Sequence, residues 1–240
     1  MNNQTPPVTS TYFVALVKDY LQGLKTKTEV LSDIAPVRAG LDIPATDEVT
    51  RQVIVTARQL NEDIYEEMIT AIAHATDTTP TRAGMVHHLK ALLQGSISEA
   101  DFRQWATWHN EPGTDTGGGF FDDLAVDYFC TRLVPQSGQE LTGHHYEKAL
   151  EIFSHKAEQP LKDKVALVLL TEKEQQRFLF YIGDYTAGHH TPEQLDVYLM
   201  NRFGMDHYSF PYMAEITALV NNPSKLPQLL QMARNGASLV

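Results

Sequence analysis

Apolar residues recur every three or four positions along most of this chain, and this spacing constrains the fold more than any other feature of the sequence. The longest stripe runs through Val49, Val53, Ala57, Leu60, Ile64, Met68, Ala71 and Ala75. Side chains at this spacing lie on one face of an α-helix, whereas a half-buried strand would show alternation at every second residue, which is seen nowhere. The sequence therefore predicts an all-α protein.

The same periodicity predicts a multi-helix bundle of about ten helices. Their expected ranges are 10–33, 47–76, 82–94, 99–109, 120–134, 143–157, 161–170, 172–186, 192–203, 210–221 and 225–235. Pro36, Gly40 and Pro44 indicate a loop after the first of these helices.

Several helix ends carry local signals. Three hydroxyl residues are placed to cap helix N-termini, and these are Ser98, Thr171 and Thr191. Glu174 and Gln194 stand three residues after the two threonines, which is the spacing of the capping box. Three glycines follow apolar stretches and are predicted to end helices, namely Gly95, Gly204 and Gly236.

The segment 110–119 contains four glycines and one proline, a composition typical of a flexible connection. It would separate an N-terminal helical lobe, residues 1–110, from a C-terminal helical lobe, residues 117–240. Aromatic residues are frequent on both sides of the segment, so a single continuous domain with one shared core remains an equal alternative.

Charge excludes several classes of partner. Asp and Glu number 30 against 19 Lys and Arg, which gives a formal net charge of −11. Nucleic acids and anionic membranes both require a cationic surface, so neither is an expected partner.

The longest apolar run, Val165–Leu170, is far shorter than the roughly 20 residues of a membrane-spanning helix. With no legible secretory signal, a cytoplasmic location is expected.

Two acidic clusters are the candidate partner-binding residues. The first consists of Glu62, Asp63, Glu66 and Glu67, and the second of Asp122, Asp123 and Asp127. Each is explained either by a solvated acidic face or by a surface complementary to a basic protein. Tyrosines such as Tyr198, Tyr208 and Tyr212 are expected in the core, and any that is exposed would be a candidate interface anchor.

The histidines and the cysteine do not predict a metal or cofactor site. Three adjacent pairs occur, at positions 87–88, 144–145 and 189–190, and neighbouring helical residues point about 100° apart, so a pair cannot chelate one ion. His145 and His190 lie near expected helix starts, where a surface or capping role is favoured. The single cysteine, Cys130, is expected to be buried and unreactive.

The segment 89–105 resembles a stretch of small, all-helical bacterial immunity proteins, including those of the colicin D type. The resemblance rests on a helix that ends at Gly95, an Ile97-Ser98 turn that caps the next helix, and an aromatic residue, Trp105, that packs back. It covers about 17 residues. It implies a non-enzymatic cytosolic protein that binds and blocks a toxin.

These observations favour an acidic helical protein that binds a basic protein partner without cofactor or catalysis, and the resemblance implies that this partner is a bacterial toxin. The alternative is a metal-dependent all-α hydrolase or lyase that uses Asp122, Asp123 and Asp127, with His144 and His145 as further ligands. A third hypothesis is a scaffold subunit, for which a large apolar surface patch would be expected.

Overall fold

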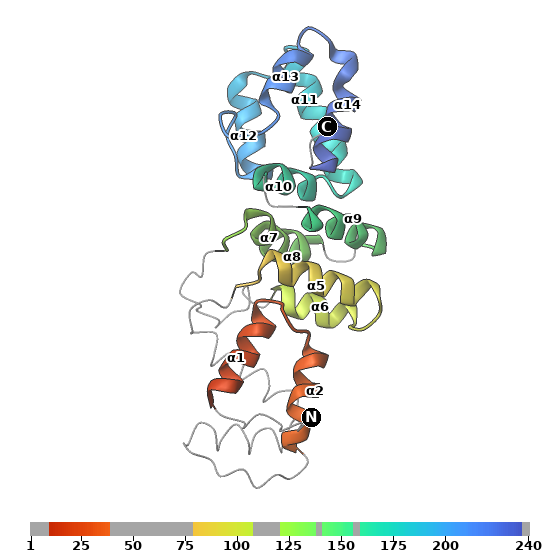
Figure 1. Ribbon diagram of the computed structural model, residues 1–240. Coiled ribbons are helices and arrows are strands. Elements are labelled where there is room, and N and C mark those ends of the chain that lie inside the picture. Colours follow the sequence, from red (N-terminus) through yellow and green to blue (C-terminus); the bar gives the residue numbers. More distant parts are fainter. Residues whose placement is uncertain (1–9, 39–78, 108–120, 138–140, 156–158, 237–240) are drawn as a thin grey trace. The chain divides into compact units, whose positions relative to one another are not determined.

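The computed structural model describes residues 10–38, 79–107, 121–137, 141–155 and 159–236, and the structural statements below concern these residues. Helices are the regular elements throughout them, and they contain no strand (Figure 1). The prediction of an all-α, multi-helix fold is thus confirmed. None of the described helices is long and apolar enough to cross a bilayer.

The chain divides into two compact units, Met1–Phe121 and Asp122–Val240. The helices described in the first unit are α1 (Ser10–Leu21), α2 (Lys27–Arg38), α5 (Arg82–Leu93) and α6 (Glu99–Thr107). The second unit begins with α7 (Leu124–Tyr128), the π-helix η2 (Phe129–Leu133), α8 (Val134–Ser137), α9 (Gly143–Ser154) and α10 (Pro160–Val168). It continues with α11 (Glu172–Thr186), α12 (Pro192–Phe203), α13 (Met213–Leu219), the 3₁₀-helix η3 (Pro223–Lys225) and α14 (Leu226–Asn235). The predicted connection 110–119 and the predicted helix 47–76 lie outside the described residues.

The prediction of one helix over residues 10–33 is wrong, because the chain turns at Gly23, whose φ is +83°. A new helix then starts with a capping box that the sequence analysis missed. The backbone N–H of Thr26 donates to the Glu29 carboxylate at 2.7 Å, and the N–H of Glu29 donates to the Thr26 hydroxyl at 3.3 Å. This helix, α2, continues through Pro36, which was expected in a loop. A proline in a last turn removes only one backbone hydrogen bond, so the helix reaches Arg38.

Most of the predicted caps are confirmed. Ser98 and Asp101 cap α6 reciprocally, and Thr191 with Gln194 forms the predicted capping box of α12. Thr171 accepts the N–H of Glu174, but the Glu174 carboxylate binds arginines instead of completing the box. The three predicted terminal glycines, Gly95, Gly204 and Gly236, each follow a helix with positive φ.

The helix predicted over residues 120–134 differs from the observed one in its first residue and in its helix type. It begins at Leu124, because Asp123 has extended backbone angles and caps the helix. Its middle turn, Phe129–Leu133, is a π-helix, and the helical segment ends at Ser137. The remaining predicted helices agree with the observed ones within a few residues, and 172–186 and 192–203 agree at both ends.

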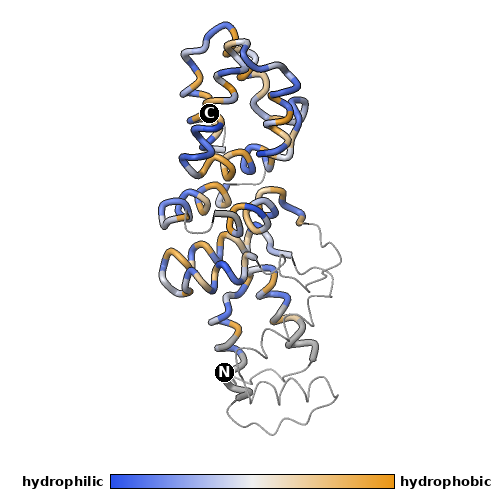
Figure 2. The backbone as a smooth tube through the Cα atoms, turned by 180° about the vertical axis from the view of Figure 1, so that it is seen from behind, coloured by the Kyte–Doolittle hydropathy of each residue, from blue (hydrophilic) through white to orange (hydrophobic). Residues whose placement is uncertain are grey.

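The second unit is organised around α10 and the two residues after it. Every side chain from Val165 to Leu170 is at most 8% exposed. Helices α7, α9, α12 and α14 all contact α10, which lies among them and buries its surface on several sides (Figure 1). Along the surrounding helices, hydrophobic and hydrophilic positions alternate with helical spacing (Figure 2), so each contributes one apolar face to the core.

The first unit is held together by the close approach of the α1–α2 turn to the start of α5. The Gln22 carbonyl accepts the backbone N–H of Thr81 at 3.0 Å and the Thr81 hydroxyl at 3.1 Å. A Cβ atom on Gly84 would lie 1.9 Å from the Gln22 oxygen and 2.8 Å from the Cα of Gly23. Contact at this range requires glycine, because any side chain would separate the two segments.

Substitution of Gly84 by alanine is therefore expected to destabilise the first unit by about 1–3 kcal/mol, because the added methyl group overlaps the Gln22 carbonyl. Gly143→Ala is the matched control, since a Cβ there has no atom within 4 Å. Amide hydrogen exchange of each unit measures the effect. Equal protection in the wild type and the Gly84→Ala variant would contradict the packing described.

Candidate functional site

The predicted partner-binding residues fall into two groups. Glu62, Asp63, Glu66 and Glu67 lie outside the described residues. Asp122 is exposed at the start of the second unit, whereas Asp123 is half-buried and accepts the N–H groups of Ala125 and Val126 at 2.8 and 3.2 Å. Asp127 is half-buried and lies 3.4 Å from the Thr131 hydroxyl. Asp123 therefore has a structural role as an N-cap.

Metal-ligand groups are not brought together in the described part of the chain. Within it, no three His, Cys, Asp or Glu side chains are placed to hold a metal ion. His145 is instead used as a cap: its Nδ1 accepts the Thr142 N–H at 2.9 Å, as the predicted capping role requires. Burial and the neighbouring His144 lower the pKa of His145. His190 packs its ring against Tyr181, with ring centroids 5.4 Å apart.

Cys130 lies in the π-helical turn and is fully buried, as predicted. Burial raises the pKa of its thiol far above the ordinary value, and the nearby Asp127 carboxylate adds to the effect. Since the thiolate is the reactive form, this environment suppresses nucleophilic chemistry at Cys130.

An ionic contact of low exposure joins α11 to α12 in the second unit. The Glu174 carboxylate, whose side chain is 13% exposed, accepts Arg177 Nη1 at 2.8 Å and Arg202 Nε at 3.0 Å, with a second bond from Arg202 Nη2. The two bonds from Arg202 form the bidentate geometry that makes arginine–carboxylate pairs strong. Arg202 is 28 residues from Glu174, so no local sequence signal could have predicted the pair.

Two tyrosines lie beside this ionic contact. Burial, reinforced by the Glu174 charge, raises the pKa of Tyr128 to about 12 and that of Tyr198 further. Both phenols are therefore protonated at neutral pH and do not act as bases. Tyr198 also stacks on Tyr181, with ring centroids 4.2 Å apart, which anchors α12 on α11.

The outer side of α12 combines exposed apolar side chains with carboxylates. We call this the α12 surface, and it consists of Glu193, Asp196, Val197, Met200, Asp206 and Tyr208. Val197 is 61% exposed, Met200 53% and Tyr208 87%. The expectation that Tyr208 lies in the core is thus wrong, because it follows α12 in a loop that turns outward.

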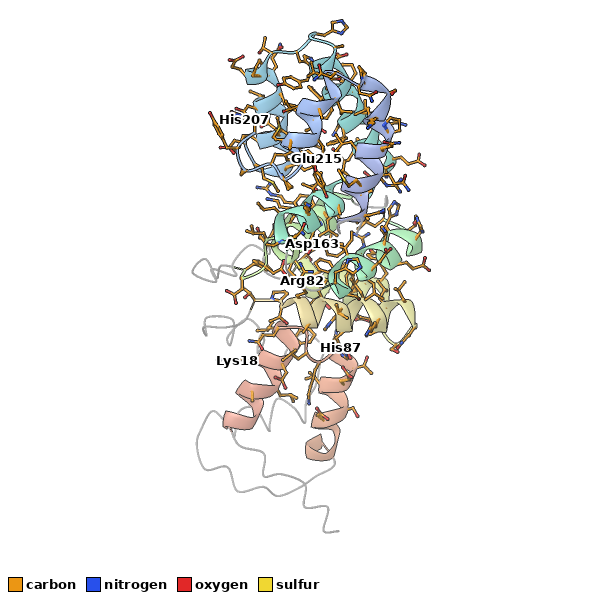
Figure 3. All side chains as sticks on the ribbon, turned by 45° about the horizontal axis from the view of Figure 1, so that its top comes forward. Lys18, Arg82, His87, Asp163, His207 and Glu215 are labelled. Atoms are coloured by element: carbon orange, nitrogen blue, oxygen red, sulfur yellow. The ribbon has the colours of Figure 1, made fainter. Side chains whose placement is uncertain are left out.

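Contacts with Asp196 fold this loop back onto α12. The backbone N–H of His207 donates to Asp196 at 2.8 Å, and His207 Nδ1 lies 2.8 Å from the second carboxylate oxygen. Figure 3 shows His207 on the outside of its unit, beside α12. The Tyr208 ring lies on that of His207, with centroids 3.8 Å apart. Met200 follows Asp196 by four positions and so lies on the same face of α12, and Tyr208 is held beside this face through His207.

A second surface feature is a groove of about 420 Å³ between α13 and α14. Ala218, Leu219, Leu229 and Met232 contribute apolar atoms to it. Glu215 and Lys225 also line it with opposite charges, so its rim shows no preference for a charged partner.

Comparisons with known proteins gave no relative: no family model matches the chain, and neither the curated proteins nor the solved structures contain a significant match.

Replacement of Arg202 by glutamine is expected to destabilise the second unit by about 1–3 kcal/mol, because it leaves the poorly exposed Glu174 carboxylate with one cation instead of two. Lys148→Gln is the control, since its partner Glu151 is 55% exposed and the loss should stay below about 1 kcal/mol. Urea unfolding of both variants gives the two values. Equal losses would show that the Arg202–Glu174 pair is no stronger than a surface pair.

The thiol of Cys130 is expected to react with a disulfide reagent at least about a hundredfold more slowly in the native chain than in urea, because the reaction requires local opening. The chain has one cysteine, so the released chromophore reports this site alone. Complete reaction of the native protein within the mixing time would contradict its burial.

Proposed function

We propose that this chain binds and blocks a basic protein partner, as an immunity protein that neutralises a bacterial toxin in the cytoplasm. The observation that carries the proposal is the α12 surface, where Val197, Met200 and Tyr208 are exposed beside the carboxylates of Glu193, Asp196 and Asp206. Exposed apolar side chains bordered by charge of one sign are typical of protein interfaces.

The charge of this surface favours a cationic partner. Hydrogen bonds from Thr191 lower the pKa of Glu193, and those from Ser209 lower the pKa of Asp206, so both carboxylates are ionised at neutral pH. Arg202 belongs to the same helix but is paired with Glu174. The carboxylates of the α12 surface would thus steer a basic protein during encounter, in line with the net charge of −11.

Tyr208 is suited to anchor the contact. It is 87% exposed, yet its ring rests on His207, which Asp196 holds at 2.8 Å. An aromatic side chain supported in this way loses little conformational freedom on binding, which increases its contribution to affinity.

The toxin class has separate support from residues 89–105. Helix α5 ends before Gly95, Ser98 caps α6, and Trp105 packs back to donate a hydrogen bond to the Tyr20 carbonyl at 2.9 Å. This corner between two helices is the segment on which the proposed resemblance to immunity proteins rests. Glu62, Asp63, Glu66, Glu67 and Asp122 remain further proposed contact residues, together with Asp127 and Asp123.

The test compares the wild type with a Val197→Asp/Tyr208→Ala variant, each tagged and purified from the native host. We expect the wild type to recover one basic protein in stoichiometric amount and the variant to recover at least about tenfold less, as for loss of an interface anchor. Phe180→Ala is the control, because Phe180 is also exposed, at 58%, but lies on α11.

The recovered protein is then expressed alone in a heterologous bacterium. It should arrest growth, and co-expression of the wild type, but not of the double variant, should restore growth. Equal recovery by the wild type and the variant would exclude the α12 surface, and a recovered protein without toxicity would overturn the immunity role.

A further inference from the structure

His88 is a buried titratable group at the junction of three elements in the first unit. His88 is 1% exposed, and its ring stacks on Trp105 of α6 with ring centroids 3.7 Å apart and an interplanar angle of 16°. Its Nδ1 lies 3.0 Å from the carbonyl oxygen of Gly23 in the α1–α2 turn. Because a carbonyl only accepts, the proton of the neutral ring is on Nδ1.

This contact belongs to the close packing described above. Gly23 and Gly84 approach without side chains, and a Cβ on Gly23 would lie 2.5 Å from the Trp105 ring. Trp105 in turn donates to the Tyr20 carbonyl at the end of α1. His88 thus links α5 to the α1–α2 turn on one side and to α6 on the other.

The charged groups around His88 cannot neutralise a second proton on its ring. The Glu29 carboxylate of α2 raises the pKa of His88 only weakly. It already binds Thr26 and lies 2.9 Å from the His87 Nε2. On α5, a charged His87 ring lowers the pKa of His88, and Figure 3 marks the position of His87. Tyr20 of α1 and Trp105 of α6 are uncharged neighbours. In the described part of the chain, no carboxylate lies within ion-pair distance of the His88 ring.

We propose that His88 is an acid-sensitive latch: proton uptake by its buried ring releases the α1–α2 turn from α5 and α6 and exposes the apolar residues packed there. The released surface includes Leu21 and Trp105, both at most 1% exposed in the closed form. This role is independent of the α12 surface, which belongs to the other unit.

The direction of the pH effect follows from burial. Burial lowers the pKa of His88 from 6.5 to about 4, although hydrogen bonds to the Gly23 and Gly84 carbonyls oppose the shift. The closed form is therefore fully favoured above pH 6.5, and the preference is lost as the pH falls from 6.5 towards 4. Proton linkage over this window makes the opening equilibrium constant about 20-fold larger at pH 5 than at pH 7.

The test uses the full chain with Trp108→Phe, which leaves Trp105 as the single tryptophan reporter. Between pH 7 and 5 we expect the amides around Gly23 and Gly84 to exchange about 20-fold faster under conditions of fast reclosing, after correction for intrinsic rates, and Trp105 emission to shift to the red in proportion to the open fraction. His88→Gln should abolish this pH dependence, because an amide can donate to Gly23 but takes up no proton. His87→Gln, the adjacent control, should retain it.

No pH dependence in the wild type, or the same dependence in His88→Gln, would overturn the latch. If the His88→Gln variant does not fold, the ring of His88 in the wild type decides the question by NMR. It should remain neutral, with its proton on Nδ1, from pH 7 to 5 in the closed form, and titration near pH 6.5 in the folded chain would likewise overturn the proposal.

Discussion

The second unit depends on the burial of a short apolar segment that cannot be stable alone. Helix α10 has nine residues, fewer than an isolated helix needs in water, and all six side chains of Val165–Leu170 are buried. Its stability must come from α7, α9, α12 and α14, which contact it, and these helices in turn bury their apolar faces on it. The stability of this core is therefore shared among α10 and these four helices.

That core positions the surface proposed to bind a partner. Leu195, Leu199 and Phe203 turn one face of α12 into the core, which leaves Val197 and Met200 on the opposite face. The Glu174–Arg202 pair and the Tyr181–Tyr198 stack fix the helix against α11. Val197 and Met200 are thus held on a fixed helix and lose less entropy on binding than side chains on a mobile loop would.

The first unit is stabilised differently, by the close approach of two glycines and by hydrogen bonds from the polar and aromatic side chains beside them. Gly23 and Gly84 bring the α1–α2 turn against α5, and His88 and Trp105 satisfy the carbonyls of Gly23 and Tyr20. A neutral imidazole suits this buried position, whereas the carbonyls of Gly23 and Gly84 only partly offset the desolvation of a charged one. The same interaction that stabilises the unit therefore makes it sensitive to acid.

The amino-acid sequence by itself determined the helical class and those helix ends that carry local signals. Helices α11 and α12 were predicted at both ends because Thr171, Thr191 and Gly204 act within one turn of their own helix. The Thr26–Glu29 capping box carried the same kind of signal and was overlooked. Tertiary structure alone decided the break at Gly23, the pairing of Glu174 with Arg202 and the exposure of Tyr208. Each of these features depends on residues that are distant in sequence. The apolar periodicity of a helix shows which of its faces is buried, but it does not show which other segment packs against that face.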